Sequence, residues 1–134
     1  MEYHISQSAY LIKTISENDL QQFAQITGDN NPVHLDETYA QKTRFGKRIA
    51  HGMLGASLIS AVIGTQLPGE GTIYLSQSLQ FKAPMYIGDT ITAQVTITNI
   101  REDKPLITLE TVCTNQHGTA VIHGEALVLH EKAM

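Results

Sequence analysis

The sequence lacks the features that are typical of secreted, nucleic-acid-binding and membrane proteins. Its single cysteine, Cys113, cannot form an internal disulfide, which fits a reducing compartment, and we expect a cytoplasmic location. With 9 Lys and Arg against 13 Asp and Glu, the net charge of -4 offers no attraction to nucleic acid or to an anionic membrane. Residues 1–10 lack a basic segment followed by an apolar run, so we expect no secretory signal. The apolar stretch 53–67 is too short for a membrane span.

Several sequence motifs of common enzyme classes are also missing. The chain has no G-x-S-x-G elbow, no glycine-rich phosphate loop before a helix and no dinucleotide fingerprint. These absences argue against a serine hydrolase, an NTPase and a Rossmann oxidoreductase. Four residues offer metal-ligand atoms: Asp29, His34, Asp36 and His51. No compact Cys and His spacing accompanies them, and imidazole with carboxylates selects no particular metal, so we expect no metal site.

What remains is a chain with the composition of one globular domain. Its 134 residues are 42% hydrophobic and 16% charged, which supplies enough apolar surface for a core, and we expect one domain over 1–134. Apolar spacing predicts these elements: a strand near 9–12, a helix over 17–27, a short helix over 36–42, a helix over 51–66, and strands over 72–81, 90–98, 106–116 and 119–130. The helix over 51–66 is apolar on nearly every side, as expected of a helix surrounded by protein. Short turns between the later strands predict an α+β fold, with an antiparallel sheet curled around that helix.

Local signals indicate where these elements begin and end. Ser16, with Asp19 three residues later, is typical of a capped helix start, and Gly28 is typical of a helix end. The segment 29–34 is rich in turn formers, so we expect a loop there, and Asp36 is placed to cap the next helix. In the strand over 72–81, alternation places four apolar residues on one face: Ile73, Leu75, Leu79 and Phe81.

Asp29 and His34 are the first candidates for catalysis. They lie on one turn-rich segment on opposite sides of Pro32, so a compact turn can aim both side chains into a common space. A carboxylate that orients an imidazole can hold a water molecule and take its proton. The structural alternative is that Asp29 caps a turn and His34 bonds to the backbone, which is common for such residues in loops.

The pair His51 and Gly52 opens the apolar helix. Unpaired N–H groups at a helix start, together with the positive end of the helix dipole, can stabilise an oxyanion such as the enolate formed from a thioester. The alternative is that Gly52 only permits tight packing. Cys113 has no electropositive neighbour in the sequence and is interpreted as a small buried hydrophobe. Ser57 and Ser60 in the helix are expected to bond to backbone carbonyls of the preceding turn.

Taken together, these segments form a longer pattern. The pattern comprises Phe23, Thr27-Gly28-Asp29, Asn31-Pro32-Val33-His34, Asp36, Tyr39-Ala40, Phe45, His51-Gly52-Met53-Leu54, Leu67-Pro68-Gly69, Tyr74, Gln77-Ser78-Leu79, Phe81-Lys82, Pro84, Gly88-Asp89 and the run from Arg101 to Pro105. It covers most of the chain and resembles the MaoC-like (R)-specific enoyl-CoA hydratases, above all the short, single-domain bacterial members. The T-G-D-x-N-P-x-H segment followed by H-G-M is specific to the hydratase and dehydratase branch of the fold.

The resemblance implies a hot-dog fold and a homodimer whose two sheets join edge to edge, with acyl-CoA near the subunit boundary. Asp29 and His34 would activate water, the N–H of Gly52 would hold the thioester oxygen, and Asn31 would support the loop. The implied reaction is reversible addition of water to trans-2-enoyl-CoA, giving (R)-3-hydroxyacyl-CoA. It needs no metal and no cofactor, because CoA is part of the substrate.

Further residues are candidates for substrate contacts. Lys82 resembles a basic position near the CoA entrance of related proteins, and three more cations are available to CoA phosphates: Arg44, Lys47 and Arg48. Taken alone, each cation is better explained as solvated surface charge. Ser60 and Ile63 lie along the helix beside which the acyl chain would run, so they are candidates for setting chain length.

Three other functions stay open at this point. A thioesterase of the same fold would direct water to the thioester carbon and release CoA thiol. A non-catalytic module would bind acyl-CoA or acyl-carrier protein without turnover, although such a binder has no need of the pair Asp29 and His34. Catalysis on acyl-carrier-protein substrates is the third alternative, and the negative net charge makes docking to an acidic carrier less favourable.

Overall fold

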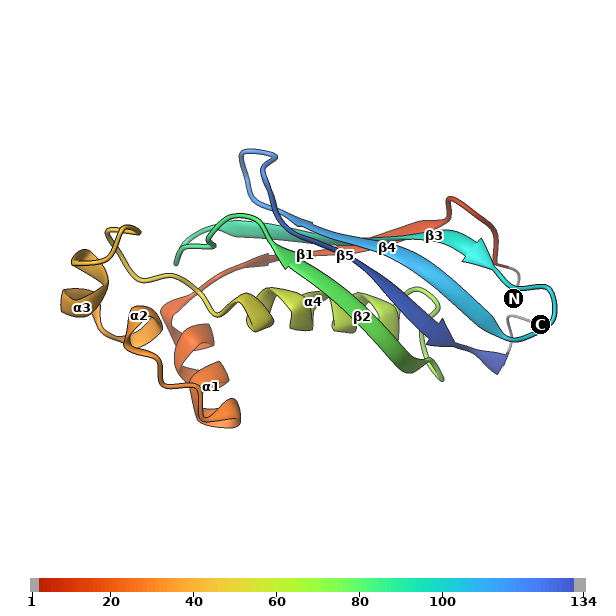
Figure 1. Ribbon diagram of the computed structural model, residues 1–134, viewed down its shortest axis with the longest axis horizontal. Helices are drawn as coiled ribbons and strands as arrows, with labels where there is room; N and C mark the ends of the chain where they lie inside the picture. The colour runs from red at the N-terminus through yellow and green to blue at the C-terminus, as the bar shows by residue number, and fades with distance from the viewer. Residues whose placement is uncertain (1–2, 132–134) are drawn as a thin grey trace.

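A five-stranded antiparallel sheet curves over one long helix in the computed structural model, which describes residues 3–131 (Figure 1). The elements are β1 (Ser8–Thr14), α1 (Glu17–Thr27), α2 (Pro32–Leu35), α3 (Glu37–Gln41), α4 (Gly52–Thr65), β2 (Ile73–Phe81), β3 (Thr90–Ile100), β4 (Leu106–Thr114) and β5 (Ala120–Leu129). The strand order is β1-β3-β4-β5-β2, and all neighbours are antiparallel. Helix α4 lies against one face of the sheet, and α1 to α3 gather at one end (Figure 1). This architecture confirms the predicted α+β class.

Helix α1 begins and ends as the sequence predicts. The Ser16 hydroxyl accepts a hydrogen bond from the N–H of Asp19, while the Asp19 carboxylate accepts one from the N–H of Ser16. This reciprocal pair satisfies two backbone donors that the helix itself leaves free. At the other end Gly28 adopts a left-handed φ of 80°, which glycine adopts without steric cost. The chain therefore turns sharply immediately before Asp29.

The segment after α1 differs from the predicted loop because it contains a short helix. Asn31 caps α2 by accepting a hydrogen bond from the N–H of Val33, and Pro32 occupies the first helical position. Proline suits that position because its fixed φ is already helical and its missing N–H is not needed there. Asp36 then caps α3 through the N–H of Tyr39, as predicted. Two consecutive caps thus fix the path of this short segment.

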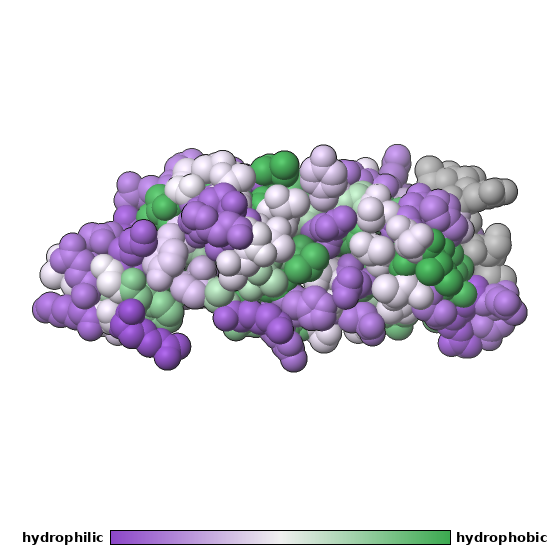
Figure 2. All heavy atoms as spheres, turned by 90° about the horizontal axis from the view of Figure 1, so that it is seen from above, coloured by the Kyte–Doolittle hydropathy of each residue, from purple (hydrophilic) through white to green (hydrophobic). Residues whose placement is uncertain are grey.

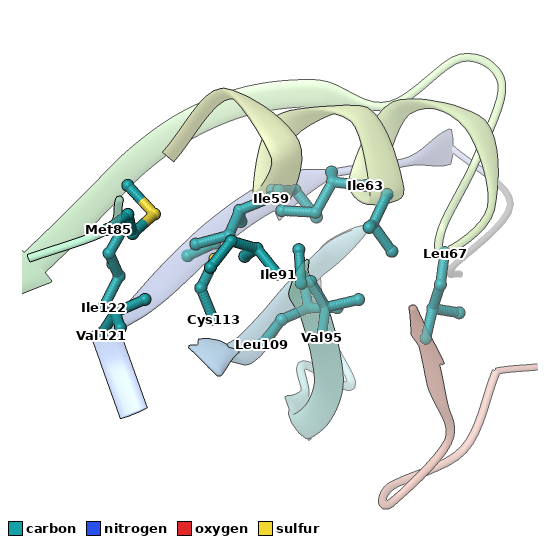
Figure 3. Packing of buried hydrophobic residues seen from close by; sticks show 14 of the residues in the cluster. Ile59, Ile63, Leu67, Met85, Ile91, Val95, Leu109, Cys113, Val121 and Ile122 are labelled. Carbon is teal, nitrogen blue, oxygen red and sulfur yellow. The ribbon is translucent and has the colours of Figure 1, made fainter. Parts of the chain in front are cut away.

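The hydrophobic core lies between α4 and the sheet. Alternate residues of β3 and β4 are fully buried, and the side chains of Ile59 and Ile63 on α4 reach toward Ile91, Val95 and Leu109 (Figure 3). The other face of the sheet is mostly polar with separate apolar clusters, as expected where one face meets solvent (Figure 2). Within residues 3–131, no helix has the length and apolar character needed to cross a membrane.

Helix α4 is buried on one side only within the single chain. Met53, Ser57, Ser60 and Gly64 are exposed along its opposite side. The predicted wrapping on nearly every side is therefore incomplete, because one sheet offers a helix only one packing face. Ser57 donates a hydrogen bond to the carbonyl of Met53, one turn earlier, as expected for a serine in a helix.

Strand β2 departs from simple alternation because it contains a β-bulge. The register with β5 shifts between Tyr74 and Ser76, so Leu75 opposes no residue of β5. An extra residue reverses the alternation beyond it. Phe81 pairs with the buried Ile122 and faces the α4 side of the sheet, whereas Ile73 lies on the opposite face. The four apolar residues that alternation grouped together therefore do not share one face.

A contrast between two glycines of α4 tests how closely the helix packs. We expect Gly55→Ala to destabilise the protein by about 1–3 kcal/mol through overpacking, because a Cβ there would lie 2.5 Å from Cδ1 of Ile122. Gly64→Ala should raise stability by about 1 kcal/mol, since a Cβ at Gly64 meets nothing within 4 Å. Urea unfolding of both variants measures the difference. Equal stabilities would contradict the close helix-to-sheet contact at Gly55.

Candidate active site

A cavity of about 430 Å³ opens at the N-terminal end of α4. Its lining combines polar and aromatic side chains, among them Asp29, His34, His51, Phe81 and Lys82, with the backbone of Gly52. The predicted catalytic residues Asp29, His34 and Gly52 all line this one cavity. The structure thus brings together residues from the segment after α1, the start of α4 and the end of β2.

Asp29 lies at the rim of the cavity and is held by its own loop. Its N–H donates to the Thr27 hydroxyl at 3.1 Å, and that hydroxyl donates to the carbonyl of Phe23 at 2.7 Å. Its Oδ1 accepts a hydrogen bond from the N–H of Asn31 at 3.2 Å. Oδ2 accepts none from the residues that the structure describes. Asp29 therefore stabilises the turn, as the structural alternative predicts, and keeps one carboxylate oxygen available.

His34 lies on α2 and is buried, with 8% of its surface exposed. Its Nδ1 is 2.8 Å from the carbonyl oxygen of Ile49. Because a carbonyl only accepts, Nδ1 carries the proton, and Nε2 of the neutral ring keeps its lone pair. The backbone contact expected from the structural alternative is therefore present, and it also fixes the tautomer that a general base requires.

Burial lowers the pKa of His34 below its ordinary value of 6.5, because the charged ring would lose its hydration. The Ile49 carbonyl opposes this shift by favouring the protonated ring. His51 lowers the pKa of His34 further and the Asp29 carboxylate raises it, and the net direction is downward. The ring is therefore neutral at neutral pH and able to accept a proton.

His51 lies at the predicted start of the apolar helix, but the sequence did not indicate its contacts with His34 and Asp29. Its ring stacks on that of His34, with 3.8 Å between centroids and 26° between planes. Its Nε2 lies 3.1 Å from the carbonyl oxygen of Asp29, and the ring of Phe23 packs at 4.9 Å. The available signal was a histidine at the start of an apolar helix, where a buried polar ring needs a partner.

The cluster also resembles a metal-ligand set by distance. One ligand atom each from Asp29, His34 and His51 lies within 4.8 Å of the others. The ring stack opposes coordination, because imidazole lone pairs lie in the ring plane and two nearly parallel planes do not meet within a metal-to-nitrogen distance of about 2 Å. The geometry thus favours proton transfer over metal binding.

Gly52 occupies the first turn of α4, where backbone donors are available. The residue before the helix, His51, makes no side-chain capping bond to it. Gly52 lines the cavity, so the positive end of the helix dipole lies beside it. A Cβ at Gly52 would lie 2.7 Å from the Phe81 ring, so glycine is also required by close packing. Both predicted uses of Gly52 are compatible with this position.

The remaining predicted residues differ in whether they reach the cavity. Asn31 supports the loop by capping α2, and Lys82 and Arg44 line the cavity. Arg48 differs from its predicted role at a phosphate, because it is buried, pairs with Glu17 at 2.6 Å and donates from Nε to the carbonyl of His34. Its guanidinium therefore braces the segment that carries His34.

Lys47, Ser60 and Ile63 do not line the cavity of the single chain. The Lys47 ammonium lies over the Tyr86 ring at 4.5 Å from its centroid. Ser60 is exposed on the free side of α4, and Ile63 belongs to the core at 1% exposure. Selection of chain length by Ser60 and Ile63 stays a prediction.

Comparison with known proteins shows what the chain is similar to. A family model described as a MaoC like domain matches residues 6–121. Two proteins named (R)-specific enoyl-CoA hydratase are similar to the chain. The one from Rhodospirillum rubrum is 57% identical over 92% of this chain and 85% of its own length, and the one from Aeromonas caviae is 48% identical over 92% of each.

Solved structures show the same architecture. One, described as an (R)-hydratase from A. caviae involved in PHA biosynthesis, has a TM-score of 0.93 at 46% identity, covering 96% of this chain and 97% of that one. An R-hydratase from Pseudomonas aeruginosa in the unliganded form has a TM-score of 0.91 at 44% identity, covering 96% and 82%. These similarities confirm the predicted hot-dog fold. On the evidence of its sequence and its fold, the chain belongs to the MaoC-like family.

Proposed function

We propose that the chain catalyses the reversible hydration of trans-2-enoyl-CoA to (R)-3-hydroxyacyl-CoA. The observation that carries the proposal is the convergence of Asp29, His34 and Gly52 on one cavity, with ligand atoms of the two side chains within 4.8 Å. The relatives named (R)-specific enoyl-CoA hydratase support the choice of reaction. We place the activity in the cytoplasm, where the single thiol of Cys113 would stay reduced.

The proposed mechanism uses the protonation states described above. Water binds between Asp29 and His34, and Nε2 of His34 takes a proton from it while Asp29 orients it. The oxygen forms a bond to the β carbon, the electron pair of the C=C bond forms a double bond between the α carbon and the thioester carbon, and the carbonyl pair moves onto the thioester oxygen. The N–H of Gly52 stabilises this enolate oxygen. The pair of Asp29 and His34 then delivers the proton taken from water to the α carbon, and the enolate electrons return to restore the thioester carbonyl.

Substrate binding is proposed along the same cavity. Lys82 and Arg44 bring positive charge to its lining, which suits the phosphates of CoA. Phe81 and Met53 add apolar surface beside Gly52, which suits the start of an acyl chain. A longer chain would continue along α4 toward Ser60 and Ile63. Asn31 takes part indirectly by holding the turn that carries Asp29.

Loss of enoyl-thioester absorbance with crotonyl-CoA tests the reaction. We expect turnover, with a product that an (S)-specific hydroxyacyl-CoA dehydrogenase refuses. Release of CoA thiol would identify a thioesterase instead. Binding of acyl-CoA without any absorbance change, across short and medium enoyl chains, would contradict the hydratase proposal and favour a binding module. A parallel assay with crotonyl-acyl-carrier protein separates the two carriers.

We also propose that two copies assemble through β2. This strand lies at one edge of the sheet, and its Ile73, Leu75 and Phe81 are each about half exposed. Exposed apolar side chains on an unpaired edge favour association with another strand. Light scattering should therefore give a mass twice the 14.7 kDa of the chain, and Leu75→Lys should lower it toward the monomer. A monomeric parent protein would refute the homodimer.

The pH dependence of turnover should report the neutral state of His34. Burial lowers its pKa below 6.5, so the ring stays unprotonated down to a more acidic pH than an exposed histidine does. The base is active above that pKa and is lost as the pH falls through it. We therefore expect kcat/KM to hold from neutral pH to below 6.5 and then decline. An acid midpoint above 6.5 would contradict the assignment.

A further inference from the structure

His51 touches both members of the proposed catalytic pair. Its ring stacks on His34 at 3.8 Å between centroids, and its Nε2 lies 3.1 Å from the backbone oxygen of Asp29. The side chain is 1% exposed, so these contacts are shielded from water. His51 also precedes Gly52 at the start of α4. One buried ring therefore connects the three components of the proposed mechanism.

The hydrogen bonds of His51 indicate where its proton lies. The Asp29 carbonyl only accepts, so Nε2 of His51 carries a proton. The other nitrogen, Nδ1, is buried and has no hydrogen-bond partner among the described residues. A buried polar atom without a partner is costly, and such atoms in native structures require an explanation. The contacts of the ring with Asp29 and His34 account for its retention.

The charges around the two rings come from several elements. The Asp29 carboxylate approaches from the loop, and Arg48 donates to the carbonyl of His34 while it pairs with Glu17. Arg44 and Lys82 line the cavity. One face of the His34 ring is covered by the His51 ring, which in turn packs against Phe23. A ring stacked at 3.8 Å leaves no room for a water molecule between the two planes, so this face cannot hydrate a protonated His34.

We propose that His51 is a positioning residue for the hydration, a role that rests on the proposed function. Its Nε2–H holds the backbone of Asp29, which fixes where the carboxylate lies. Its stacked ring keeps one face of His34 dry and so keeps that imidazole neutral. The two contributions come from different parts of the side chain, so different substitutions separate them.

His51→Phe and His51→Gln each retain one contribution. Phenylalanine keeps the stacked ring and loses the donor, so kcat should fall about 100-fold through misplacement of Asp29, while the titration of His34 should move less than it does in His51→Gln. Glutamine keeps an amide donor but opens the stacked face to water. Its His34 should titrate at a higher pH, and the acid limb of kcat/KM should move in the same direction. Nitrogen NMR of the His34 ring measures its titration, and steady-state kinetics measure kcat and the acid limb of kcat/KM.

Two further measurements separate positioning from a merely structural role. His117→Phe, at an exposed turn, is the matched control and should retain parental kinetics and His34 titration. In the parent protein, the nitrogen shifts of His51 should show a proton on Nε2, and an Nε2 without a proton would overturn the proposal without any variant. The proposal would also be overturned if His51→Phe kept the parental kcat and His51→Gln left the His34 titration unchanged. The NMR result stands even if the parent protein hydrates no enoyl-CoA, so failure of the proposed function is recognised separately.

Discussion

Replacing Asp29 by asparagine should lower kcat for crotonyl-CoA hydration by about 10²–10⁴-fold, the usual contribution of a general acid or base. The amide cannot hold the negative charge that orients water toward His34. It can still accept the hydrogen bond from the N–H of Asn31, which the Asp29 Oδ1 accepts in the parent protein. The loop should therefore keep its shape, and the loss should appear in kcat with little change in melting temperature.

Asp103→Asn is the matched control for this prediction. The chemical change is identical, and Asp103 pairs with Arg101 in an exposed turn far along the chain. Its kinetics should equal those of the parent protein. If Asp29→Asn and Asp103→Asn show the same turnover, Asp29 takes no part in the chemistry, and the mechanism has to be reassigned to other groups of the cavity.

Gly52→Ala should produce the second large effect, a loss in kcat/KM of about 10²–10³-fold, comparable to removing one oxyanion donor. The added Cβ would lie 2.7 Å from the Phe81 ring, closer than atoms can remain. Phe81 is 53% exposed, so its ring can move, but it also lines the cavity. Either the ring enters the substrate space or the first turn of α4 shifts. Both movements displace the thioester from the Gly52 N–H.

A second substitution distinguishes steric displacement from other causes. Phe81→Ala removes the atoms that the new Cβ would meet, so the double variant should recover activity relative to Gly52→Ala alone. Gly64→Ala, in the same helix and with nothing near its Cβ, should leave kinetics unchanged. A double variant no more active than Gly52→Ala would show that the contact with Phe81 is not the cause of the loss.

Much of the fold follows from local signals in the sequence. The ends of α1 depend on Ser16, Asp19 and Gly28, whose hydrogen bonds and φ angle involve only near neighbours. Alternation in β3 and β4 reports a buried and an open face, and both strands lie inside the sheet, where this rule is strongest. The positions of Asp29 and His34 on one short segment likewise indicated that they lie close together.

Features that depend on distant residues did not follow from the sequence. The bulge at Leu75 is a mismatch between β2 and β5, so it is visible only once the two strands are paired. His51 meets His34 because α2 and the start of α4 approach each other in space, and no local pattern encodes that approach. Arg48 forms its ion pair with Glu17, a residue 31 positions earlier in the chain, so local sequence does not indicate this pair either.

The proposed chemistry is concentrated in one continuous segment, residues 29–52, which lies at the end of the sheet beside α1 (Figure 1). An isolated bridge between Ile49 and Tyr86, and a hydrogen bond from Ala50 to Met85, join this segment to the part of the chain that leads into β3. Of the segment 29–52, Ala50 alone belongs to the hydrophobic core that the sheet and α4 form. The scaffold and the reactive groups are therefore largely separable in evolution, since changes confined to one short stretch can replace the reaction while the sheet continues to fold.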